Sequence, residues 1–352
     1  MPVFTVDQLR ELGRSLLMAA GTPPAAAETV AEELAQANLV GHDSHGVMRL
    51  VQYVQMIHDG FVKPTAALEV IQHGPGYAVL DAHFSLGQVA AAKALELGLE
   101  QAQAVGTATI LVRNCNHVGR LGSYGEQAAR RGCLALMAVN APGPGGVAPF
   151  GGIDRRLGTN PICMAAPRGD GAVVLDMTTS ATAEGKLRVA FQKGEPIGEG
   201  LLINSCGEAS INPADFYANP CGAILPLGGG MGHKGFGLAV MIDIFCGILS
   251  GSGVARTDLP RGANGVWLQL LEIERFLPRS VYDMWMDRYV AHLKDCRLQP
   301  GCAEILLPGE IEQRRRAERE RDGIPIPEET LRQILETASR LGADVSFLSV
   351  EG

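Results

Sequence analysis

The chain has 352 residues, of which 46% are hydrophobic and 19% are charged, and its formal net charge is −8. This composition predicts a soluble globular protein with enough chain for two domains, and the balance of 38 Asp and Glu against 30 Lys and Arg disfavours nucleic-acid binding. No apolar run reaches the roughly 20 residues that a bilayer requires, and the N-terminal stretch is unlike a signal peptide. We therefore expect a cytoplasmic protein without a membrane partner.

Eight cysteines are spread along the chain, and no two of them form a C-x-x-C pair. Cys115 and His117 are the only near pair of a cysteine and a histidine, which is too few ligands for a zinc site. Spread cysteines in a chain of this size indicate reduced, mostly buried thiols. We predict no bound metal.

The first 60 residues are predicted to be helical. A capping box at Thr5–Gln8 begins the first helix, which ends at Gly21. Pro23 and Pro24 begin a second, alanine-rich helix that runs to about Leu39.

A third helix is predicted from residue 43 or 44 to about residue 57. Within it His45, Arg49 and Tyr53 are spaced four residues apart and would lie on one face. An acid–base group, a guanidinium suited to carboxylates and a phenol would then share one stripe. The alternatives are a solvated helix face and a metal site, the latter formed by His42, Asp43 and His45.

A mixed α/β region is predicted to follow. Two strands flank a turn at Gly74–Gly76, and a second capping box at Ser85–Gln88 begins a helix that ends near Ala104. Hairpins beside strand–helix–strand units favour a mixed sheet over a purely parallel one. Further strands are predicted at 107–114, 134–141, 160–167, 171–178, 265–273 and 303–310, and further helices at 121–131, 236–249, 280–296, 310–321 and 327–341.

Gly230, Gly232 and Gly235 match the dinucleotide-binding fingerprint between a strand and a helix. The segment after that helix does not read as a second strand with an acidic end, so a Rossmann domain is disfavoured. The glycines can still expose amide groups at a helix start beside His233 and Lys234, which favours binding of phosphate or pyrophosphate. The alternative is a glycine loop that serves only close helix packing.

Two further stretches carry polar groups at the ends of predicted strands. His117 lies between a strand and a helix, where α/β proteins place ligands, and the alternative is a histidine that caps the helix. A second polar run can bind a ribose or an amide, although a turn followed by an N-cap is the commoner use of such residues. This run consists of Asp176, Met177, Thr178, Thr179 and Ser180.

Six motifs occur in order across almost the whole chain: DSHGVMRLVQY, NHVGRLGSYGEQAA, FGGIDRRLGTNPICMAAP, LDMTTSATAEGKLRVAFQKGEP, LPLGGGMGHKGFGLAVMID and LPGE. Together they resemble the malate/L-lactate dehydrogenase family of non-Rossmann NAD(P)-dependent oxidoreductases. That family includes sulfolactate, ureidoglycolate and diketogulonate enzymes and a cyclic-imine reductase, and HVGRLG and KLRVAFQKGEP look most similar to its hydroxycarboxylate branch. Two stretches, 141–149 and 202–210, depart from the usual pattern.

The resemblance implies an α/β (α+β) fold in two domains. A mixed-sheet, non-Rossmann cofactor domain would span residues 71–299, and a helical domain would be built from both chain ends, residues 1–70 and 300–352. A homodimer is implied as well.

The resemblance also implies roles for site residues. His45 and His117 would lie in the active cleft, with either of them as the proton-transfer residue, and Ser44 would orient His45 or relay a proton to it. Arg49 would bind the substrate carboxylate, and Tyr53, on the same predicted face, would contact the substrate. The contacts to NAD or NADP would come from Asp176, Met177, Thr178, Thr179, Ser180, His233, Lys234, Pro308, Gly309 and Glu310.

The expected reaction is hydride transfer between nicotinamide C4 and C2 of a 2-hydroxy or 2-oxo acid, such as malate, lactate or a related hydroxycarboxylate. One rival is reduction of a cyclic imino acid, which would use the same carboxylate clamp. Two rivals from other classes are a metal-assisted hydrolase that uses His42, Asp43 and His45, and a non-catalytic nucleotide sensor. The sequence carries no clear signal that separates NAD from NADP.

Overall fold

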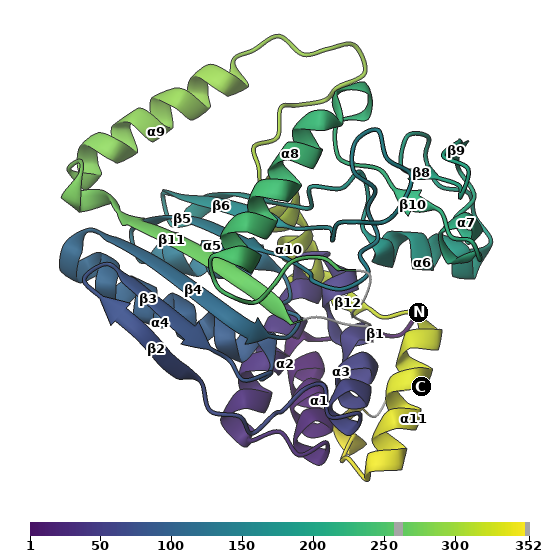
Figure 1. The fold of residues 1–352 in the computed structure, drawn as a ribbon. Helices are drawn as coiled ribbons and strands as arrows, with labels where there is room; N and C mark the ends of the chain where they lie inside the picture. The colour runs from purple at the N-terminus through teal and green to yellow at the C-terminus, as the bar shows by residue number, and fades with distance from the viewer. Residues whose placement is uncertain (257–262, 349–352) are drawn as a thin grey trace.

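A seven-stranded mixed sheet forms the centre of the protein (Figure 1), whose computed structural model describes residues 1–256 and 263–348. In this part of the chain only β3 and β4 are parallel neighbours, and the other neighbouring strands of the sheet are antiparallel. The predicted mixed α/β fold is thus confirmed. The order across the sheet is β2 (Glu69–Gly74), β3 (Tyr77–Asp81), β4 (Thr107–Cys115), β11 (Asn264–Glu272), β5 (Cys133–Val139), β6 (Ile162–Arg168) and β7 (Gly171–Met177).

Helices cover both faces of this sheet. α4 (Gly87–Val105) and α5 (Leu121–Arg130) pack on one face, where Met137 of β5 joins the largest buried apolar cluster. The next residue of β5, Ala138, points to the other face and joins Ile242 of α8 (His233–Ile242) and Cys246 of the π-helical turn Asp243–Ile248. This alternation along one strand places the sheet between two helical layers (Figure 1).

The two chain ends share a separate apolar cluster. α1 (Val6–Ala19), α2 (Pro24–Leu39), α3 (Leu50–His58) and α11 (Glu328–Leu341) contribute to it, and β1 (Val3–Phe4) pairs with β12 (Ile324–Pro325) beside it. Figure 1 shows the N- and C-terminal segments side by side. α10 (Glu310–Asp322) lies against α2. The domain boundaries at 70/71 and 299/300 remain a prediction.

The remaining elements lie around this frame. α9 (Arg279–Lys294) projects from the body of the molecule (Figure 1). No helix in residues 1–256 and 263–348 is both long and apolar enough to cross a membrane.

A small lobe contains α6 (Glu184–Lys193), β8 (Leu202–Ile203), β9 (Ala209–Ser210), α7 (Ala214–Tyr217) and β10 (Ala223–Ile224).

The predicted third helix is wrong in its first half. The chain forms two 3-10 turns, Asp43–His45 and Val47–Arg49, and Gly46 between them is extended, with φ −89° and ψ −157°. The cause is Asn38, whose Oδ1 accepts a hydrogen bond from the backbone N–H of Val47 at 2.8 Å. A Cβ at Gly46 would lie 2.1 Å from that same oxygen. His45 is therefore off the α-helical face that carries Tyr53.

Four other sequence predictions are corrected. Residues 303–306 are not a strand, and the helix expected at 236 begins at His233 and changes to a π-helical turn at Asp243. Ser85–Gln88 is not a capping box, because Leu86 is the N-cap of α4 and makes no side-chain cap bond. Cys206, Cys221, Cys296 and Cys302 are exposed, and the other four cysteines are buried. Residues 257–262 of the loop expected before β11 lie outside the described residues.

Candidate active site

Two histidines from distant parts of the chain meet where the helical part adjoins the sheet. His45 ends the first 3-10 turn, and His117 lies in the loop between β4 and α5. Their rings are stacked, with centroids 5.5 Å apart and planes 20° apart. The two residues that the sequence offered as alternatives for proton transfer are therefore neighbours in one site.

Each imidazole has one nitrogen held by a hydroxyl group. The Ser44 Oγ lies 3.0 Å from Nδ1 of His45, and the Tyr53 hydroxyl lies 2.6 Å from Nδ1 of His117. Among the described residues, neither ring has a hydrogen-bond partner at Nε2. Both Nε2 atoms are therefore available to a ligand.

The surroundings keep both imidazoles neutral. Burial lowers the pKa of His45 to about 3, and the nearby guanidinium of Arg49 contributes to this shift. Burial, and again the charge of Arg49, hold the pKa of His117 well below its usual range. A neutral ring can accept a proton, and an anion that offsets the charge of Arg49 would make that easier.

Arg49 presents one edge of its guanidinium to the site. Its Nε donates to the backbone oxygen of Ser44 at 2.6 Å, and Nη1 donates to Oε1 of Gln52 at 2.7 Å. Nη2 has no partner in the described part of the chain. A Cβ at Gly185 would lie 4.0 Å from that Nη2 and 3.3 Å from Cβ of Ser44. The two bonds fix the plane of the guanidinium, and the glycine keeps the adjoining space open for a carboxylate.

Tyr53 joins the site through its hydroxyl. The residue is only 2% exposed, and the amide nitrogen of Gln88 donates to its hydroxyl at 2.8 Å. Gln88 was not predicted as a site residue, because its position at the end of a Ser-x-x-Gln pattern resembled a helix cap. Contact between Tyr53 and substrate remains a prediction.

The polar run at the end of β7 leads into this region. Oδ2 of Asp176 accepts a hydrogen bond from the backbone N–H of Gly122, at the start of α5, at 2.7 Å. Burial raises the pKa of Asp176. Thr179 and Ser180 are buried, and their hydroxyls donate to backbone carbonyl oxygens. The partly exposed members of the run, which can reach a ligand more readily, are Asp176, Met177 and Thr178.

His233 and Lys234 are the first two residues of α8, and both are exposed. Gly235 follows them, and a Cβ there would lie 2.3 Å from the backbone oxygen of Leu227, so this glycine lets the helix start pack closely on the preceding segment. The close-packing alternative therefore explains Gly235. The helix N-terminus and the positive side chain of Lys234 remain suited to an anion.

The turn at residues 308–310 is tied to β7. The backbone oxygen of Pro308 accepts a hydrogen bond from the N–H of Val174 at 3.0 Å, and Gly309 adopts φ +92° against that strand. Glu310 forms ion pairs with Arg168 and Lys294 at 3.3 and 2.8 Å. Glu310 therefore has a structural role in this turn.

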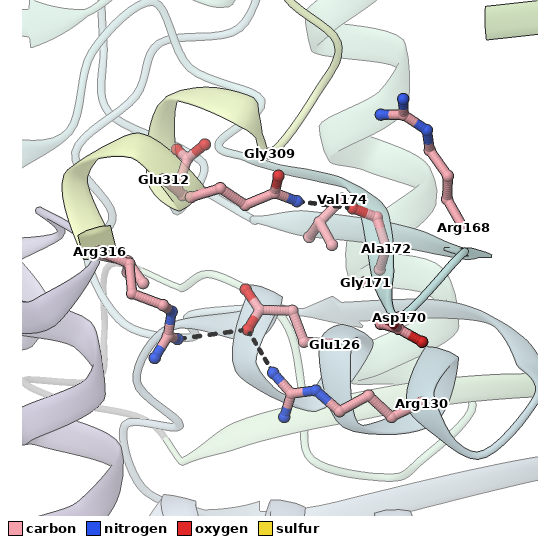
Figure 2. A pocket seen from close by; sticks show the side chains of 12 residues that line it. Glu126, Arg130, Arg168, Asp170, Gly171, Ala172, Val174, Gly309, Glu312 and Arg316 are labelled. Carbon is pink, nitrogen blue, oxygen red and sulfur yellow. Dashed lines mark hydrogen bonds and ion pairs between the residues drawn. The ribbon is translucent and has the colours of Figure 1, made fainter.

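A cavity of about 310 Å³ lies beside Gly309, between β7, α5 and α10 (Figure 2). Glu126 lies on its wall and pairs with Arg130 at 3.5 Å and with Arg316 at 3.7 Å. No sequence pattern predicts this cavity, because α5 and α10 are almost two hundred residues apart. Its arginines, which also include Arg168, have the chemistry to bind phosphate groups.

The residues proposed for metal binding have other partners. Nε2 of His42 lies 3.1 Å from Oε1 of Glu312, and Asp43 accepts hydrogen bonds from Arg319 at 2.7 and 3.0 Å. Within residues 1–256 and 263–348 no group of three or more His, Cys, Asp or Glu side chains could hold a metal ion. His42 and Asp43 are thus engaged with Glu312 and Arg319.

The profile of the malate/L-lactate dehydrogenase family matches residues 4–335. The chain belongs to this family. Malate dehydrogenase of Pyrococcus abyssi is 38% identical over 344 residues, which are 96% of this chain and 94% of that protein. Membership confirms the resemblance seen in the six motifs, and it contradicts the hydrolase and sensor alternatives.

Solved structures agree with this assignment. Sulfolactate dehydrogenase from Methanocaldococcus jannaschii superposes with a TM-score of 0.88 at 31% identity, covering 98% of this chain and 99% of that one. Delta1-piperideine-2-carboxylate reductase from Pseudomonas syringae pvar. tomato has a TM-score of 0.82 at 27% identity, covering 96% and 100%. The protein is an oxidoreductase of the dehydrogenase type, and family membership implies a nicotinamide cofactor.

Proposed function

We propose that this dehydrogenase interconverts a small 2-hydroxy acid and its 2-oxo acid, as the names of its relatives suggest for malate, lactate or a related hydroxycarboxylate. The observation that carries the proposal is the Nη2 edge of Arg49 near the Nε2 atoms of two neutral histidines, all of them without a partner among the described residues. A guanidinium for the carboxylate and an imidazole for the C2 oxygen are the two groups that such a substrate requires.

The substrate carboxylate binds to Arg49 and fixes C2 beside the histidines. Its negative charge offsets the guanidinium that lowers the pKa of His117, so the ring becomes a better base when substrate is present. During oxidation Nε2 of His117 takes the proton of the C2 hydroxyl, and during reduction it returns that proton. A nicotinamide cofactor, when bound by the residues described below, would supply the hydride chemistry at C2.

We assign the proton transfer to His117 and a supporting role to His45. Nδ1 of His117 is held by Tyr53, whose hydroxyl is in turn bonded to a buried amide, so the ring has a defined orientation. The partner of His45 is the Ser44 hydroxyl, which can either donate or accept and leaves the proton position of His45 open. Ser44 therefore orients His45 and supports the substrate wall.

The cofactor fits the chemistry of three groups of residues. Asp176, Met177 and Thr178 lie at the end of β7, and His233 and Lys234 begin α8, where Lys234 offers positive charge. The cavity beside Gly309 is lined by three arginines and by the carboxylates of Glu126, Asp170 and Glu312. α5 begins beside the His117 loop and reaches this cavity with Glu126 and Arg130. At about 1.5 Å per residue, this helix spans a distance suited to an extended dinucleotide. We propose that the cavity holds the adenosine end.

A substrate panel tests the reaction. NADH and NADPH are each mixed with malate- and lactate-type 2-oxo acids, and absorbance at 340 nm is followed. We expect oxidation of at least one cofactor with at least one 2-oxo acid, and the preferred cofactor identifies NAD or NADP. A folded protein that binds cofactor but oxidises neither with any 2-oxo acid contradicts the proposal.

Reduction of a cyclic imino acid is the second candidate. It is favoured by the likeness to the piperideine-2-carboxylate reductase, and the same guanidinium and imidazole would bind the carboxylate and protonate the nitrogen. Adding a cyclic imino acid to the panel distinguishes it, because a preference for the imine over every 2-oxo acid would show that reaction as the main one.

We also propose a homodimer in the cytoplasm. α9 exposes Trp285 and Tyr289 by 58% and 60%, and Phe276 just before it by 67%, which is a large apolar surface on a projecting helix. Free thiols at all eight cysteines support a reducing compartment. Light scattering that gives the mass of one chain, 37.2 kDa, would contradict the dimer.

A further inference from the structure

The side chain of Gln88 lies directly beneath the loop that carries His117. It is 0% exposed although it is polar. At the preceding residue, a Cβ on Gly87 would lie 2.2 Å from the backbone oxygen of Asn116 and 2.3 Å from that of His117, so the start of α4 touches this loop without a side chain between them. A Cβ at Gly119 would lie 3.5 Å from the Gln88 amide nitrogen. The amide is thus enclosed by the loop.

A chain of two hydrogen bonds connects this amide to the histidine. Nε2 of Gln88 donates to the Tyr53 hydroxyl at 2.8 Å, and that hydroxyl lies 2.6 Å from Nδ1 of His117. Because the phenol oxygen accepts from the amide, its hydrogen can be donated to Nδ1. In this arrangement a neutral His117 carries its proton on Nε2, facing the site.

The other end of the amide has no partner. Oε1 of Gln88 is buried and accepts no hydrogen bond from the described residues. A half-turn of the amide would place Oε1 against Tyr53, whose hydroxyl would then donate to Oε1 and accept from an Nδ1–H of His117. Each orientation leaves one end of the amide unpaired, so neither is locked by a second partner.

We propose that Gln88 is a positioning residue that selects, through the Tyr53 hydroxyl, which ring nitrogen of His117 carries the proton. This inference rests on the proposed function of His117 as the proton-transfer group. To take the proton of a substrate hydroxyl, Nε2 must have a free lone pair, so the neutral ring must carry its proton on Nδ1. The amide then presents Oε1 to Tyr53. When the C2 oxygen of a 2-oxo acid is reduced, the doubly protonated ring gives up its Nε2 proton and returns to the same form.

Other polar groups near His117 do not perform this task. His45 stacks on its face and Arg49 acts on it through charge, but Nδ1 is bonded to Tyr53. Gln88 decides whether the Tyr53 hydroxyl donates its hydrogen to Nδ1 of His117 or accepts one from it. Its effect should therefore fall on the proton-transfer step and leave binding of the substrate carboxylate and of the cofactor unchanged.

Gln88→Met tests this role, with Gln101→Met as the matched control. Gln101 lies on the same helix, and its Oε1 is also buried with no partner among the described residues. Its amide nitrogen donates to the backbone oxygen of Tyr77, away from the site. We expect Gln88→Met to lower kcat by about tenfold or more and to shift the pH profile of kcat, with KM and cofactor Kd within about threefold. Gln101→Met should change kcat by less than about twofold.

A double-mutant cycle asks whether Gln88 acts through Tyr53. If it does, adding Gln88→Met to Tyr53→Phe should lower kcat no further. Three results would each overturn the inference. The first is a double mutant whose loss of kcat is the product of the two single losses, and the second is a Gln88→Met enzyme with the parental kcat and pH profile. The third is a Gln88→Met enzyme that loses kcat, substrate affinity and cofactor affinity equally. The last result would show that Gln88 has only a structural role.

The position of the proton on His117 can also be measured in the absence of substrate. Histidines labelled with ¹⁵N report by NMR which nitrogen carries the proton, and a His117→Gln variant assigns the signal. We expect His117 of the parental protein to show mainly one of the two neutral forms, and Gln88→Met to show a mixture of both. An unchanged His117 signal in Gln88→Met contradicts the inference, whereas a parental enzyme that reduces no 2-oxo acid contradicts only the proposed function.

Discussion

The rings of His45 and His117 lie nearly parallel, with centroids 5.5 Å apart, although 72 positions separate the residues in sequence. Two buried, neutral imidazoles in contact cannot both become charged at low cost, because each positive charge would lower the proton affinity of the other. We therefore expect a single ring to perform the proton transfer in any one turnover and the other ring to shape its surroundings.

His117→Gln and His45→Gln should separate these two roles. We expect His117→Gln to lower kcat by roughly a hundredfold to ten-thousandfold, which is the usual contribution of general acid–base catalysis. His45→Gln should lower kcat by about tenfold or less, because it removes a neighbour of the reacting group. Steady-state kinetics with the best substrate of the panel measures both. The reverse order would assign proton transfer to His45.

The low pKa of His45 predicts a loss of stability in acid. Its pKa is about 3 in the folded protein and about 6.5 in an unfolded chain, so between these values the unfolded state binds the extra proton. Stability is therefore lost as the pH falls below 6.5, by up to about 1.4 kcal/mol per pH unit from this residue. His45→Gln should flatten the fall in unfolding free energy between pH 6.5 and 4.5. The exposed His73→Gln should leave it unchanged.

Local signals in the sequence predicted most of the elements but could not reveal long-range partners. The Thr5–Gln8 box was predicted correctly, since both of its hydrogen bonds are present. The Ser85–Gln88 stretch has the same spacing, but the capping box predicted there is absent. The amide of Gln88 instead donates a hydrogen bond to Tyr53, which lies on another helix. A pattern of four residues cannot tell these two outcomes apart.

The third predicted helix also shows that a local sequence pattern does not reveal long-range partners, here at the candidate site. Spacing alone placed His45, Arg49 and Tyr53 on one helical face. Asn38 interrupts that helix at Gly46 by bonding the N–H of Val47, and so turns His45 toward His117. The motif named the candidate site residues, whereas the contact between the two histidines depends on a buried asparagine that no local pattern marks.

Glu33 should produce the opposite pH dependence from His45. Burial raises the pKa of this carboxyl on α2 to about 7, and its Oε2 is buried without a partner in the described residues. Between pH 4.5 and 7 the folded state holds the extra proton, so stability falls as the pH rises through this range, by up to about 3 kcal/mol. Glu33→Gln keeps an oxygen that can accept from Gln127, and it should raise Tm at pH 8 but not at pH 4.5.

The control for this prediction is Glu28→Gln. Glu28 lies on the same helix but is exposed at the surface. Thermal unfolding of both variants at pH 4.5 and 8 isolates the effect of burial. Equal changes in Tm for the two variants, or a Glu33→Gln protein that is less stable at pH 8, would show that Glu33 is charged and well solvated.

Arg49→Lys should weaken substrate binding without affecting the cofactor. Lysine keeps the positive charge near His45 and His117 but loses the planar fork and the Nε bond to Ser44. We expect KM for a 2-oxo acid to rise by roughly ten- to a hundredfold, the loss of about 1.4 to 2.8 kcal/mol, with cofactor Kd within about twofold. Fluorescence titration with NADH measures the latter. A change in cofactor Kd alone would refute the carboxylate role.

Gly185→Val should fill the space that the substrate carboxylate needs. The first residues of α6 approach the site so closely that a Cβ at position 185 would be 3.3 Å from Ser44 Cβ and 4.0 Å from Nη2 of Arg49. A branched side chain there would obstruct the free edge of the guanidinium, and we expect KM to rise by about tenfold or more while Tm changes little. Gly237→Val in α8 is the control, since a Cβ at that glycine meets nothing within 4 Å. Comparable KM values for the two variants would show that the substrate lies elsewhere.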